Sequence, residues 1–401
     1  MMKAIRISPK VWWVGAIDWQ LKEFHGYTTR RGSTYNAFLV MDQKITLIDT
    51  VKAPFFGEMM ERIASVVDPA KIDEIVSNHA EMDHSGSLPE TIARVNPSAV
   101  YASTLGVKAL EAHFHDLAGK ITPVKSGDAI ELGESSLKFV ETRMLHWPDS
   151  MFSYLTGDNV LFSQDGFGMH YAVSKIFADE NDLPTMREEA ERYYANILLP
   201  YSPQVLKLLE AFPGLGLDVA VIAPDHGPLW RGDLLGTPLA WYREFAEQAV
   251  TPNALVLYDT MWHSTEKMAF AVADAIRETG CGVQVLCLAS CTRSDAAAAM
   301  LKASAIVVGS PTINNDLYPR TADVLTYLRG LRPKNMIGAA FGSSGWSGES
   351  VAKIEEYLKG AGVELVVPGL KVKYVPTAAA MDQCAALGKA VGDALLARSA
   401  Q

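Results

Sequence analysis

The sequence predicts an α/β protein with two domains that contain different kinds of sheet. Its 401 residues exceed what one hydrophobic core usually holds. Over residues 1–250, short β-branched or alternating segments are mixed with helical ones, which indicates sheets covered by helices. Beyond Pro252, strand, loop and helix follow in strict succession, which predicts a doubly wound parallel sheet. We therefore expect domains at 1–250 and 251–401.

The first domain should contain antiparallel strands and hairpins. Alternating apolar residues predict strands within 34–40, 44–50, 128–132, 135–143, 150–156 and 159–163. Helical periodicity is expected in 54–67, 105–115, 187–198 and 202–212. A further strand, 219–223, leads directly into the sequence PDHGP. The loop after that strand should therefore present Asp225 and His226.

The second domain should contain five parallel strands. Apolar segments predict them at 254–259, 282–289, 305–310, 336–342 and 364–369. Helices are expected to begin near Glu266, Ser294, Thr321 and Ser350. Five such units fit a single doubly wound sheet.

Charge and composition exclude several classes of protein. The chain has 36 basic and 46 acidic residues, and a net charge of -10 would repel nucleic acid. Residues 1–250 carry 22 basic and 33 acidic side chains (-11), whereas the remainder carries 14 and 13 (+1). No apolar stretch approaches the ~20 residues of a membrane span, and no secretory signal is evident, so a cytoplasmic protein is expected. The four cysteines form no C-x-x-C pair, which argues against disulfides, zinc ribbons and iron–sulfur clusters.

Residues of metal-ligand type follow several predicted strands. The segment IVSNHAEMDHSG places four of them within six positions, and three later strand ends add one each. A single histidine or aspartate of this kind is usually structural, so the prediction rests on the whole set. The set comprises His79, Glu81, Asp83, His84, His146, Asp165 and His226.

This spacing resembles the metallo-β-lactamase superfamily, in which an H-x-H-x-D-H loop precedes a distant His, an Asp and a last His. Here Glu81 replaces the second histidine of that loop. Carboxylate oxygen is a harder ligand than imidazole and favours iron over zinc. The substitution is typical of the flavodiiron proteins, also called A-type flavoproteins, and the resemblance covers nearly the whole chain. It implies an N-terminal metallo-β-lactamase-like αββα sandwich and a C-terminal flavodoxin-like domain.

The resemblance also implies a ligand set for two iron ions. His79, Glu81 and His146 would hold one ion, Asp83 and His226 the other, and Asp165 would bridge them. His84 is a ligand in hydrolytic relatives but turns away in some flavodiiron proteins, so both arrangements are open for this chain.

Two further residues match family positions on the distal side of the irons. They are His25, in WQLKEFHGYT, and Tyr193, in ERYYANIL. Judged by the sequence alone, both read as ordinary amphipathic residues. Structural or surface roles are expected for the side chains of His113, His115, His170 and His263.

A flavin site is predicted in the second domain. The first strand ends in a hydroxyl-rich turn before a helix, and the N–H groups of a helix N-terminus bind phosphate without a lysine. The sequence has neither G-x-x-x-x-G-K nor G-x-G-x-x-G at this turn, so a monophosphate fits best. The turn is Thr260, Met261, Trp262, His263, Ser264 and Thr265.

Two later strand ends carry polar and aromatic loops that strengthen this prediction. The order resembles flavodoxin, with FMN as the implied cofactor and Trp346 placed to stack on the flavin ring. The alternative for Trp346 is a packing role, which the three loops together disfavour. The loop residues are Pro311, Thr312, Ile313, Asn314 and Asn315, then Ser343, Ser344, Gly345, Trp346, Ser347 and Gly348.

The two sites together imply an oxidoreductase. A diiron centre and FMN can each hold two electrons, enough to reduce dioxygen to water or nitric oxide to nitrous oxide. The alternatives are a zinc hydrolase with an accessory flavodoxin domain and a non-enzymatic flavin electron carrier. Glu81 and the complete ligand set argue against them.

The resemblance further implies a head-to-tail homodimer, or a homotetramer made of such dimers, because the flavin of one chain serves the irons of another. The four cysteines cannot supply a fused rubredoxin, so a separate rubredoxin-type donor is expected. Such donors are commonly acidic, and the nearest basic cluster in the sequence is Arg329, Arg332, Lys334, Lys371 and Lys373.

Overall fold

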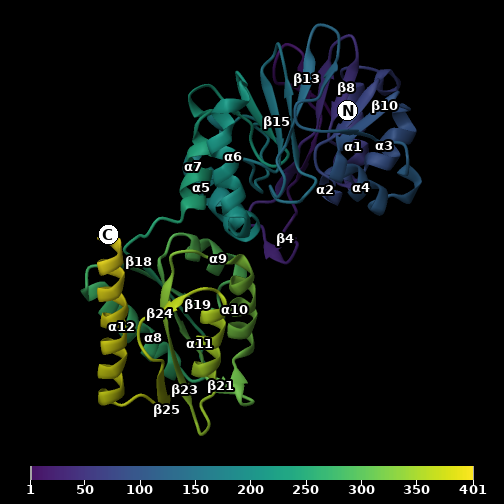
Figure 1. Ribbon diagram of the computed structural model, residues 1–401. Coiled ribbons are helices and arrows are strands. Elements are labelled where there is room, and N and C mark those ends of the chain that lie inside the picture. Colours follow the sequence, from purple (N-terminus) through teal and green to yellow (C-terminus); the bar gives the residue numbers. More distant parts are fainter. Residues whose placement is uncertain (1, 401) are drawn as a thin grey trace. The chain divides into compact units, whose positions relative to one another are not determined.

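The computed structural model describes residues 2–400, which form two compact units (Figure 1). The first unit contains the chain up to Tyr193 together with Tyr201–Arg243, and the second contains Tyr194–Pro200 and the chain from Glu244 onward. The predicted helix 187–198 is therefore divided. Helix α5 (Leu183–Tyr193) belongs to the first unit, and the π-helical segment Tyr194–Leu198 that continues it belongs to the second. The domain boundary at residue 250 stays a prediction.

The first unit contains two large sheets. The order in the first sheet is β1 (Ile5–Arg6), β2 (Val11–Trp13), β7 (Phe38–Met41), β8 (Ile45–Ile48), β9 (Glu74–Ser77), β10 (Ala99–Ser103) and β11 (Thr122–Val124). The order in the second is β12 (Ala129–Glu131), β13 (Ser136–Glu141), β14 (Met151–Leu155), β15 (Val160–Gln164), β16 (Val221–Pro224) and β17 (Trp230–Arg231). Two small hairpins pair β3 (Ala16–Asp18) with β6 (Ser33–Tyr35), and β4 (Glu23–Phe24) with β5 (Tyr27–Thr28).

Alternation along the strands divides the core of this unit into two layers. Phe38 and Val40 of β7 join side chains of the second sheet in one cluster, so they lie between the sheets. Leu39 of the same strand lies in the other cluster, where helices cover the outer face. The helices of this unit are α1 (Phe56–Ala64), α2 (Met82–Ser85), α3 (Leu88–Val95), α4 (Thr104–His113), α5, α6 (Ser202–Ala211) and the part of α7 (Thr237–Glu247) up to Arg243.

The six strands predicted in this region pair antiparallel with one another, as expected: β7 with β8, and β12 to β15 in turn. Parallel pairs that were not predicted extend both sheets. Strands β8, β9, β10 and β11 pair in parallel, and so do β15 and β16. Helices α1, α3 and α4 lie in the connections between the parallel strands, as parallel pairing requires. Parallel neighbours end at the same edge of a sheet, and this arrangement gathers the site residues described below.

The second unit has the predicted doubly wound sheet. Its order is β19 (Gly282–Cys287), β18 (Asn253–Tyr258), β20 (Ala305–Gly309), β23 (Ile337–Ser344) and β24 (Glu364–Leu365), with all pairs parallel. The fifth strand is interrupted, because β25 (Leu370–Lys373) also pairs with β23. A small hairpin joins β21 (Thr312–Ile313) to β22 (Asp316–Leu317).

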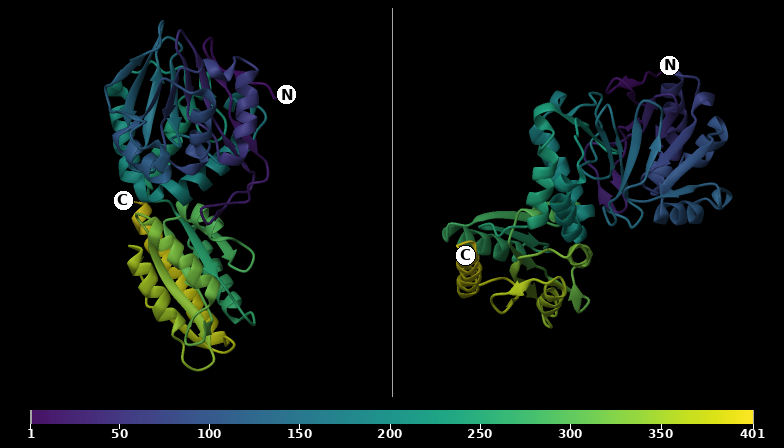
Figure 2. Two further views of the ribbon diagram at one scale, coloured as in Figure 1. Left: turned by 90° about the vertical axis from the view of Figure 1, so that its right-hand side faces the viewer. Right: turned by 45° about the horizontal axis from the view of Figure 1, so that its top comes forward.

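Helices pack on the sheet of the second unit, and the long C-terminal helix lies at one side of it (Figures 1 and 2). They are α8 (Ser264–Glu278), α9 (Arg293–Leu301), α10 (Pro319–Leu331), α11 (Ser350–Gly360) and α12 (Ala378–Ser399). Gly388 allows α12 to approach α8 closely, because a Cβ there would lie 2.3 Å from the carbonyl oxygen of Val272. Across residues 2–400, no helix is long and apolar enough to span a membrane.

Candidate metal centre and cofactor pocket

The predicted metal ligands come from the carboxyl ends of strands in both sheets of the first unit. His79 and Glu81 follow β9, and Asp83 and His84 lie on the short helix α2. The other three residues follow β13, β15 and β16, and are His146, Asp165 and His226. All of these side chains are buried except His146, which is partly exposed. The structure therefore brings together residues separated by nearly 150 positions.

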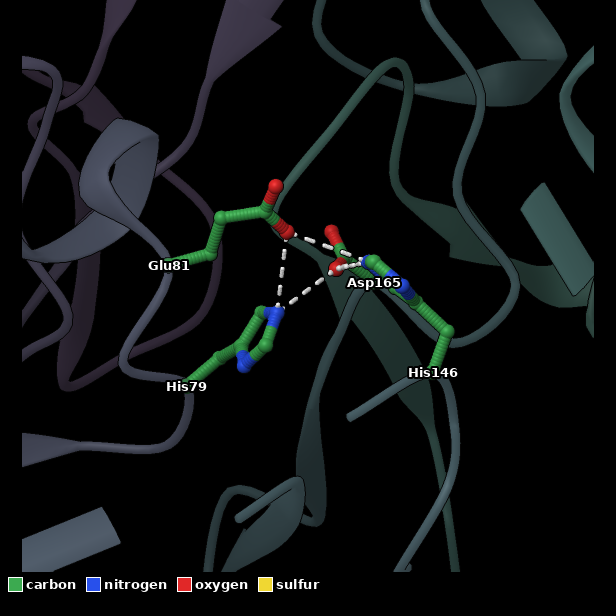
Figure 3. Close-up of side chains that lie close together, drawn as sticks. All are labelled: His79, Glu81, His146 and Asp165. Carbon is green, nitrogen blue, oxygen red and sulfur yellow. Dashed lines mark hydrogen bonds and ion pairs between the residues drawn. The ribbon is translucent and has the colours of Figure 1, made fainter. Parts of the chain in front are cut away.

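Four of these side chains form one group (Figure 3). Nε2 of His79 lies 3.2 Å from Oε2 of Glu81 and 3.2 Å from Oδ2 of Asp165. Nε2 of His146 lies 3.1 Å from each of the same two oxygens. Potential ligand atoms of the four residues all lie within 4.8 Å of one another, which is close enough to share one metal ion.

The remaining three, Asp83, His84 and His226, form a second group with the same spacing limit of 4.8 Å. Nε2 of His226 lies 3.1 Å from Oδ2 of Asp83, and Nε2 of His84 lies 3.4 Å from Oδ1 of Asp83. The other oxygen of Asp165, Oδ1, lies 3.1 Å from His84 and 3.5 Å from His226. Asp165 thus presents one oxygen to each group, as a bridging carboxylate does.

The oxygen and nitrogen atoms of these two groups are better placed to bind metal ions than to bind one another. Both carboxylate oxygens of Asp83, Oδ1 of Asp165 and both ring nitrogens of His84 are buried without a hydrogen-bond partner among the described residues. Unpaired buried polar atoms are rare because each is costly. Two neighbouring groups of carboxylate oxygens and imidazole nitrogens fit the hard, oxygen-rich coordination expected for iron.

The electrostatics of these side chains point the same way. Burial by itself lowers the pKa of His79, but Asp149, Asp165 and Glu81 raise it well above its usual value. Burial also opposes protonation of His146, whose pKa its hydrogen bonds to Asp165 and Glu81 raise to about 9. Burial would raise the pKa of Asp165, but the surrounding histidines hold it well below its usual range. Protons on the imidazoles of His79 and His146 thus supply the positive charge that bound metal ions would supply beside Asp165.

Residues behind the ligands hold the imidazole rings in place. Oδ2 of Asp149 lies 3.0 Å from Nδ1 of His79 and accepts the backbone N–H of Ala80 at 2.7 Å. Nδ1 of His226 lies 2.6 Å from the carbonyl oxygen of Thr34. Such contacts orient Nε2 of the ring toward a metal.

Sequence reasoning missed the supporting residues around His84 and His226. Nδ1 of His84 faces Oδ2 of Asp225 at 3.3 Å. His170, expected to be structural or on the surface, is buried with its ring centroid 4.4 Å from that of His226, and its Nδ1 lies 2.7 Å from Oγ of Ser33. Asp225 sits beside His226 in PDHGP, which is a local signal, whereas nothing in the sequence marks His170.

The two predicted pocket residues lie at different depths. His25 is at the turn between β4 and β5, and its Nε2 lies 2.5 Å from Oε1 of Glu81 although 62% of its side chain is exposed. That hydrogen bond raises the pKa of His25. Tyr193 is buried, with its ring 5.1 Å from that of His170. Of the histidines given structural or surface roles, His113 and His115 are exposed, as is His263, whose Nδ1 lies 2.7 Å from Glu266.

A second cavity, of ≈ 320 Å³, lies at the carboxyl ends of β18, β20 and β23 in the second unit. Ligands of doubly wound sheets bind at this edge. Nine of the predicted cofactor residues line it, namely Thr260, Met261, Trp262, Ser264, Pro311, Thr312, Ser343, Ser344 and Gly345. Tyr374 and Val375 also line it and were not predicted. Nothing in the sequence marks these two residues, because their place at the cavity depends on the pairing of β25 with β23.

The other predicted cofactor residues do not line this cavity. Oγ1 of Thr265 lies 2.8 Å from Oγ of Ser343 and joins two of the loops. Trp346 lies in the third loop with 79% of the residue exposed, so its ring is available for stacking. The remaining ones are His263, Ile313, Asn314, Asn315, Ser347 and Gly348.

The structure divides the predicted basic cluster in two. Lys371 and Lys373 lie on β25 and pair with the carboxyl-terminal part of β23, beside the cavity. Arg329, Arg332 and Lys334 precede β23, at the opposite edge of the sheet. An eight-residue strand separates the two edges by roughly 23 Å. The prediction of one continuous patch was wrong, because segments adjacent to one strand in sequence can lie at its opposite ends.

Comparisons with known proteins agree with this architecture. Residues 34–227 match the family described as ODP family beta lactamase, and residues 256–388 match Flavodoxin. The chain is 45% identical to a rubredoxin-oxygen oxidoreductase from Megalodesulfovibrio gigas, with all of both chains covered. It is 41% identical to a nitric oxide reductase from Moorella thermoacetica, with 98% of each covered.

Solved structures extend the comparison to three dimensions. The rubredoxin oxygen:oxidoreductase from Desulfovibrio gigas superimposes with a TM-score of 0.97 over all of both chains, at 45% identity. The flavodiiron protein from Giardia intestinalis gives a TM-score of 0.95 at 34% identity, covering 100% of this chain and 98% of that one. The predicted fold class and family are confirmed: the chain belongs to the flavodiiron proteins, with a metallo-β-lactamase-like domain followed by a flavodoxin-like one.

Proposed function

We propose that this protein is a flavodiiron oxidoreductase that reduces dioxygen to water, nitric oxide to nitrous oxide, or both. The observation that carries the proposal is the position of Asp165 between two groups of ligands, with one oxygen facing each. A bridging carboxylate is what two adjacent metal ions need. When bound, two irons and FMN together supply up to four electrons.

The residues of the chain have separate tasks in this proposal. His79, Glu81 and His146 would hold one ion, and Asp83, His84 and His226 would hold the other. The negative charges of Glu81, Asp83 and Asp165 offset the charge of the oxidised metal, which imidazole ligands alone would not do. Burial of nearly all these groups excludes water and restricts the site to small ligands.

His25 and Tyr193 are proposed to face the substrate. The imidazole of His25 lies against Glu81 at the exposed side of the site, where it can hold that carboxylate in place and donate a proton. Tyr193 lies against His170 on the buried side. Its hydroxyl would stay protonated, because burial raises its pKa well above the usual value.

FMN is proposed to occupy the cavity in the second unit. Its phosphate would lie at the N-terminus of α8, where Ser264 begins the helix and backbone N–H groups are unsatisfied. Trp346 and Tyr374 would flank the ring, while Thr312 and Ser344 offer polar contacts at its edge. The hydroxyls of Thr265 and Ser343 would fix the loops relative to each other.

Electrons are proposed to come from a separate rubredoxin-type protein, as the name of the M. gigas relative indicates for that enzyme. We further propose a head-to-tail homodimer, or a homotetramer of such dimers, in which the flavin of one chain reduces the irons of its partner. A cytoplasmic location and the domain limits 1–250 and 251–401 remain part of the proposal.

Turnover measurements with both substrates test the function. Protein purified with its iron and FMN is reduced anaerobically by rubredoxin and then mixed separately with dioxygen and nitric oxide. We expect reoxidation by at least one substrate, with two irons and one FMN per chain. Zinc in place of iron together with hydrolytic activity would favour the hydrolase alternative. FMN without metal and without turnover would favour an electron carrier.

A further inference from the structure

A groove on the first unit includes Leu145, the neighbour of His146, among its lining residues and is not used by the proposed reaction. It has a volume of ≈ 830 Å³ and lies between helix α6 and the segment that runs from β13 to Leu145. Sites for small molecules typically have volumes of about 300 to 1,000 Å³. All residues that line the groove belong to the first unit, so this unit forms it alone.

The lining of the groove is mainly apolar. Val140, Leu208, Leu215 and Leu217 are half-buried and present part of their surface to the groove, and Leu145 is buried. An apolar concave surface of this size is typical of sites that take up a hydrocarbon chain or ring. The groove thus has room and surface for the body of an apolar molecule.

The charged residues of the groove are mostly cations, although residues 1–250 carry a net charge of -11. Lys138 on β13 and Lys207 on α6 are exposed, and they project from the two opposite walls. Over residues 2–400, neither ammonium group takes part in a hydrogen bond or ion pair. The single carboxylate in the lining, Glu141, is already paired with Arg143 at 2.9 Å. The groove therefore favours an anion.

We propose that the groove binds a long-chain carboxylate of the fatty-acid class. The alkyl chain lies along the apolar lining, and the carboxylate lies at the ammonium groups of Lys138 and Lys207. The apolar lining and the two unpaired cations match the two parts of such a molecule, whereas a cationic amphiphile would meet like charge.

Leu145 connects the groove with the metal ligands. Its side chain packs on Gly166, where an added Cβ would lie 2.9 Å from Leu145 Cδ2. Its carbonyl oxygen accepts Nε2 of Gln164 at 2.5 Å, and Oε1 of Gln164 accepts the backbone N–H of Asp165 at 2.6 Å. Leu145 also directly precedes His146. A ligand in the groove is therefore expected to alter the absorption spectrum of the iron centre. This spectral change rests on the proposed function, whereas binding of the ligand to the groove does not.

Calorimetric titration of the full-length protein with laurate, below its micelle concentration, tests the proposal. We expect one site per chain and an affinity that falls about sixteenfold when laurate is replaced by decanoate, since each CH2 changes affinity about fourfold. Dodecyltrimethylammonium, whose alkyl chain is one carbon longer than that of laurate and whose charge is opposite, should still bind at least tenfold more weakly than laurate. Equal affinity of these two amphiphiles would overturn the proposal.

Variants then locate the site. The double variant Lys138→Gln, Lys207→Gln should weaken laurate binding at least tenfold, while the exposed control Lys71→Gln should leave it unchanged. Ala211→Trp should fill the groove and abolish binding of laurate and decanoate alike. Unchanged laurate binding in both groove variants would overturn the proposal. Dissociation of an oligomer by Ala211→Trp, measured by sedimentation, would also overturn the proposal. A second copy of the chain would then be the occupant of the groove. The lysine variant alters only exposed side chains, so it remains informative if Ala211→Trp fails to fold.

Discussion

Oδ1 of Asp165 lies 3.1 Å from Nε2 of His84, while Oδ2 of the same carboxylate faces the other group of ligands. His84 therefore points into the candidate metal centre. Of the two arrangements open from the sequence, the structure favours the one in which this imidazole is a ligand. Its other nitrogen faces Asp225, which is the usual arrangement behind a metal-bound histidine.

Replacing His84 by alanine should remove one ligand from the second group. Loss of a residue that only supports a ligand reduces metal affinity roughly 10- to 100-fold, and loss of the ligand itself should reduce it at least as much. Iron content, measured by elemental analysis after dialysis against a chelator, should fall from two toward one per chain. The exposed His115→Ala is the matched control and should retain both irons. Two tightly bound irons in His84→Ala would show that His84 is not required as a ligand.

Glu81→His would restore the ligand pattern of the hydrolytic superfamily. We expect the variant to lose iron and to lose dioxygen turnover by roughly two orders of magnitude, because imidazole brings no negative charge to the oxidised metal. Iron and zinc contents and dioxygen consumption should be measured together. Glu90→His, at an exposed position on α3, controls for the added imidazole. Full iron content with full turnover in Glu81→His would contradict the role assigned to this carboxylate.

Electron transfer between chains can be tested by mixing two inactive variants. Asp165→Ala removes the bridge between the metal groups. Ser264→Asp places a negative charge where the FMN phosphate is expected, and an acidic residue there also stabilises the N-terminus of α8. In a head-to-tail dimer, refolding an equal mixture should restore about a quarter of the wild-type activity, since half of the dimers are mixed and each has one complete pair of sites. A mixture as inactive as its components would contradict transfer between chains.

The donor should dock near Lys371 and Lys373, which lie on β25 beside the candidate flavin cavity. Changing both to glutamate should slow reduction of the flavin by rubredoxin roughly tenfold at low salt and flatten its dependence on ionic strength. Stopped-flow absorbance of the flavin measures the rate. Arg332→Glu is the control, because Arg332 lies before β23 at the opposite edge of the sheet. Equal slowing by Arg332→Glu would indicate a general charge effect rather than a docking site.

A buried carboxylate outside the site should make stability depend on pH. Asp42 accepts the backbone N–H groups of Glu134 and Ser135, each at 3.0 Å, and pairs with Lys10 at 3.0 Å. Burial alone would raise its pKa, but these contacts, with the hydroxyl of Ser135, hold it well below the usual range. The stabilisation is therefore complete above the ordinary aspartate pKa of about 4 and is lost as the pH falls further.

We expect Asp42→Asn to lower the free energy of unfolding by about 2 kcal/mol at pH 7. The difference from the wild type should shrink as the pH falls below about 4, because the unfolded chain then takes up a proton at Asp42 that the folded protein does not. Urea unfolding of the metal-free protein at several pH values measures this difference. Asp116→Asn, at an exposed position, should change stability by less than about 0.5 kcal/mol at every pH. A difference independent of pH would contradict the assignment.

The sequence by itself determined the two-domain α/β architecture and the ligand types of the metal centre. The architecture and the ligand types both depend on the order of segments along the chain. A strand must end before a loop can present His79 and Glu81. The alternation of strands with helices predicts parallel pairing in the second unit. The hydroxyl-rich turn after β18 was recognisable for the same reason, since it directly precedes the N-terminus of α8.

Only the tertiary structure decided which way His84 points, that His170 lies against His226, and that the basic residues flanking β23 form two clusters rather than one. It also decided that Tyr374 lines the candidate flavin cavity and that β8 to β11 run parallel. Each of these features depends on which distant segment packs against a residue and at which edge of a sheet a segment emerges. Side-chain periodicity within one segment carries no information about which other segments lie beside it in space. Those neighbouring segments determine the direction of an imidazole and the continuity of a charged surface.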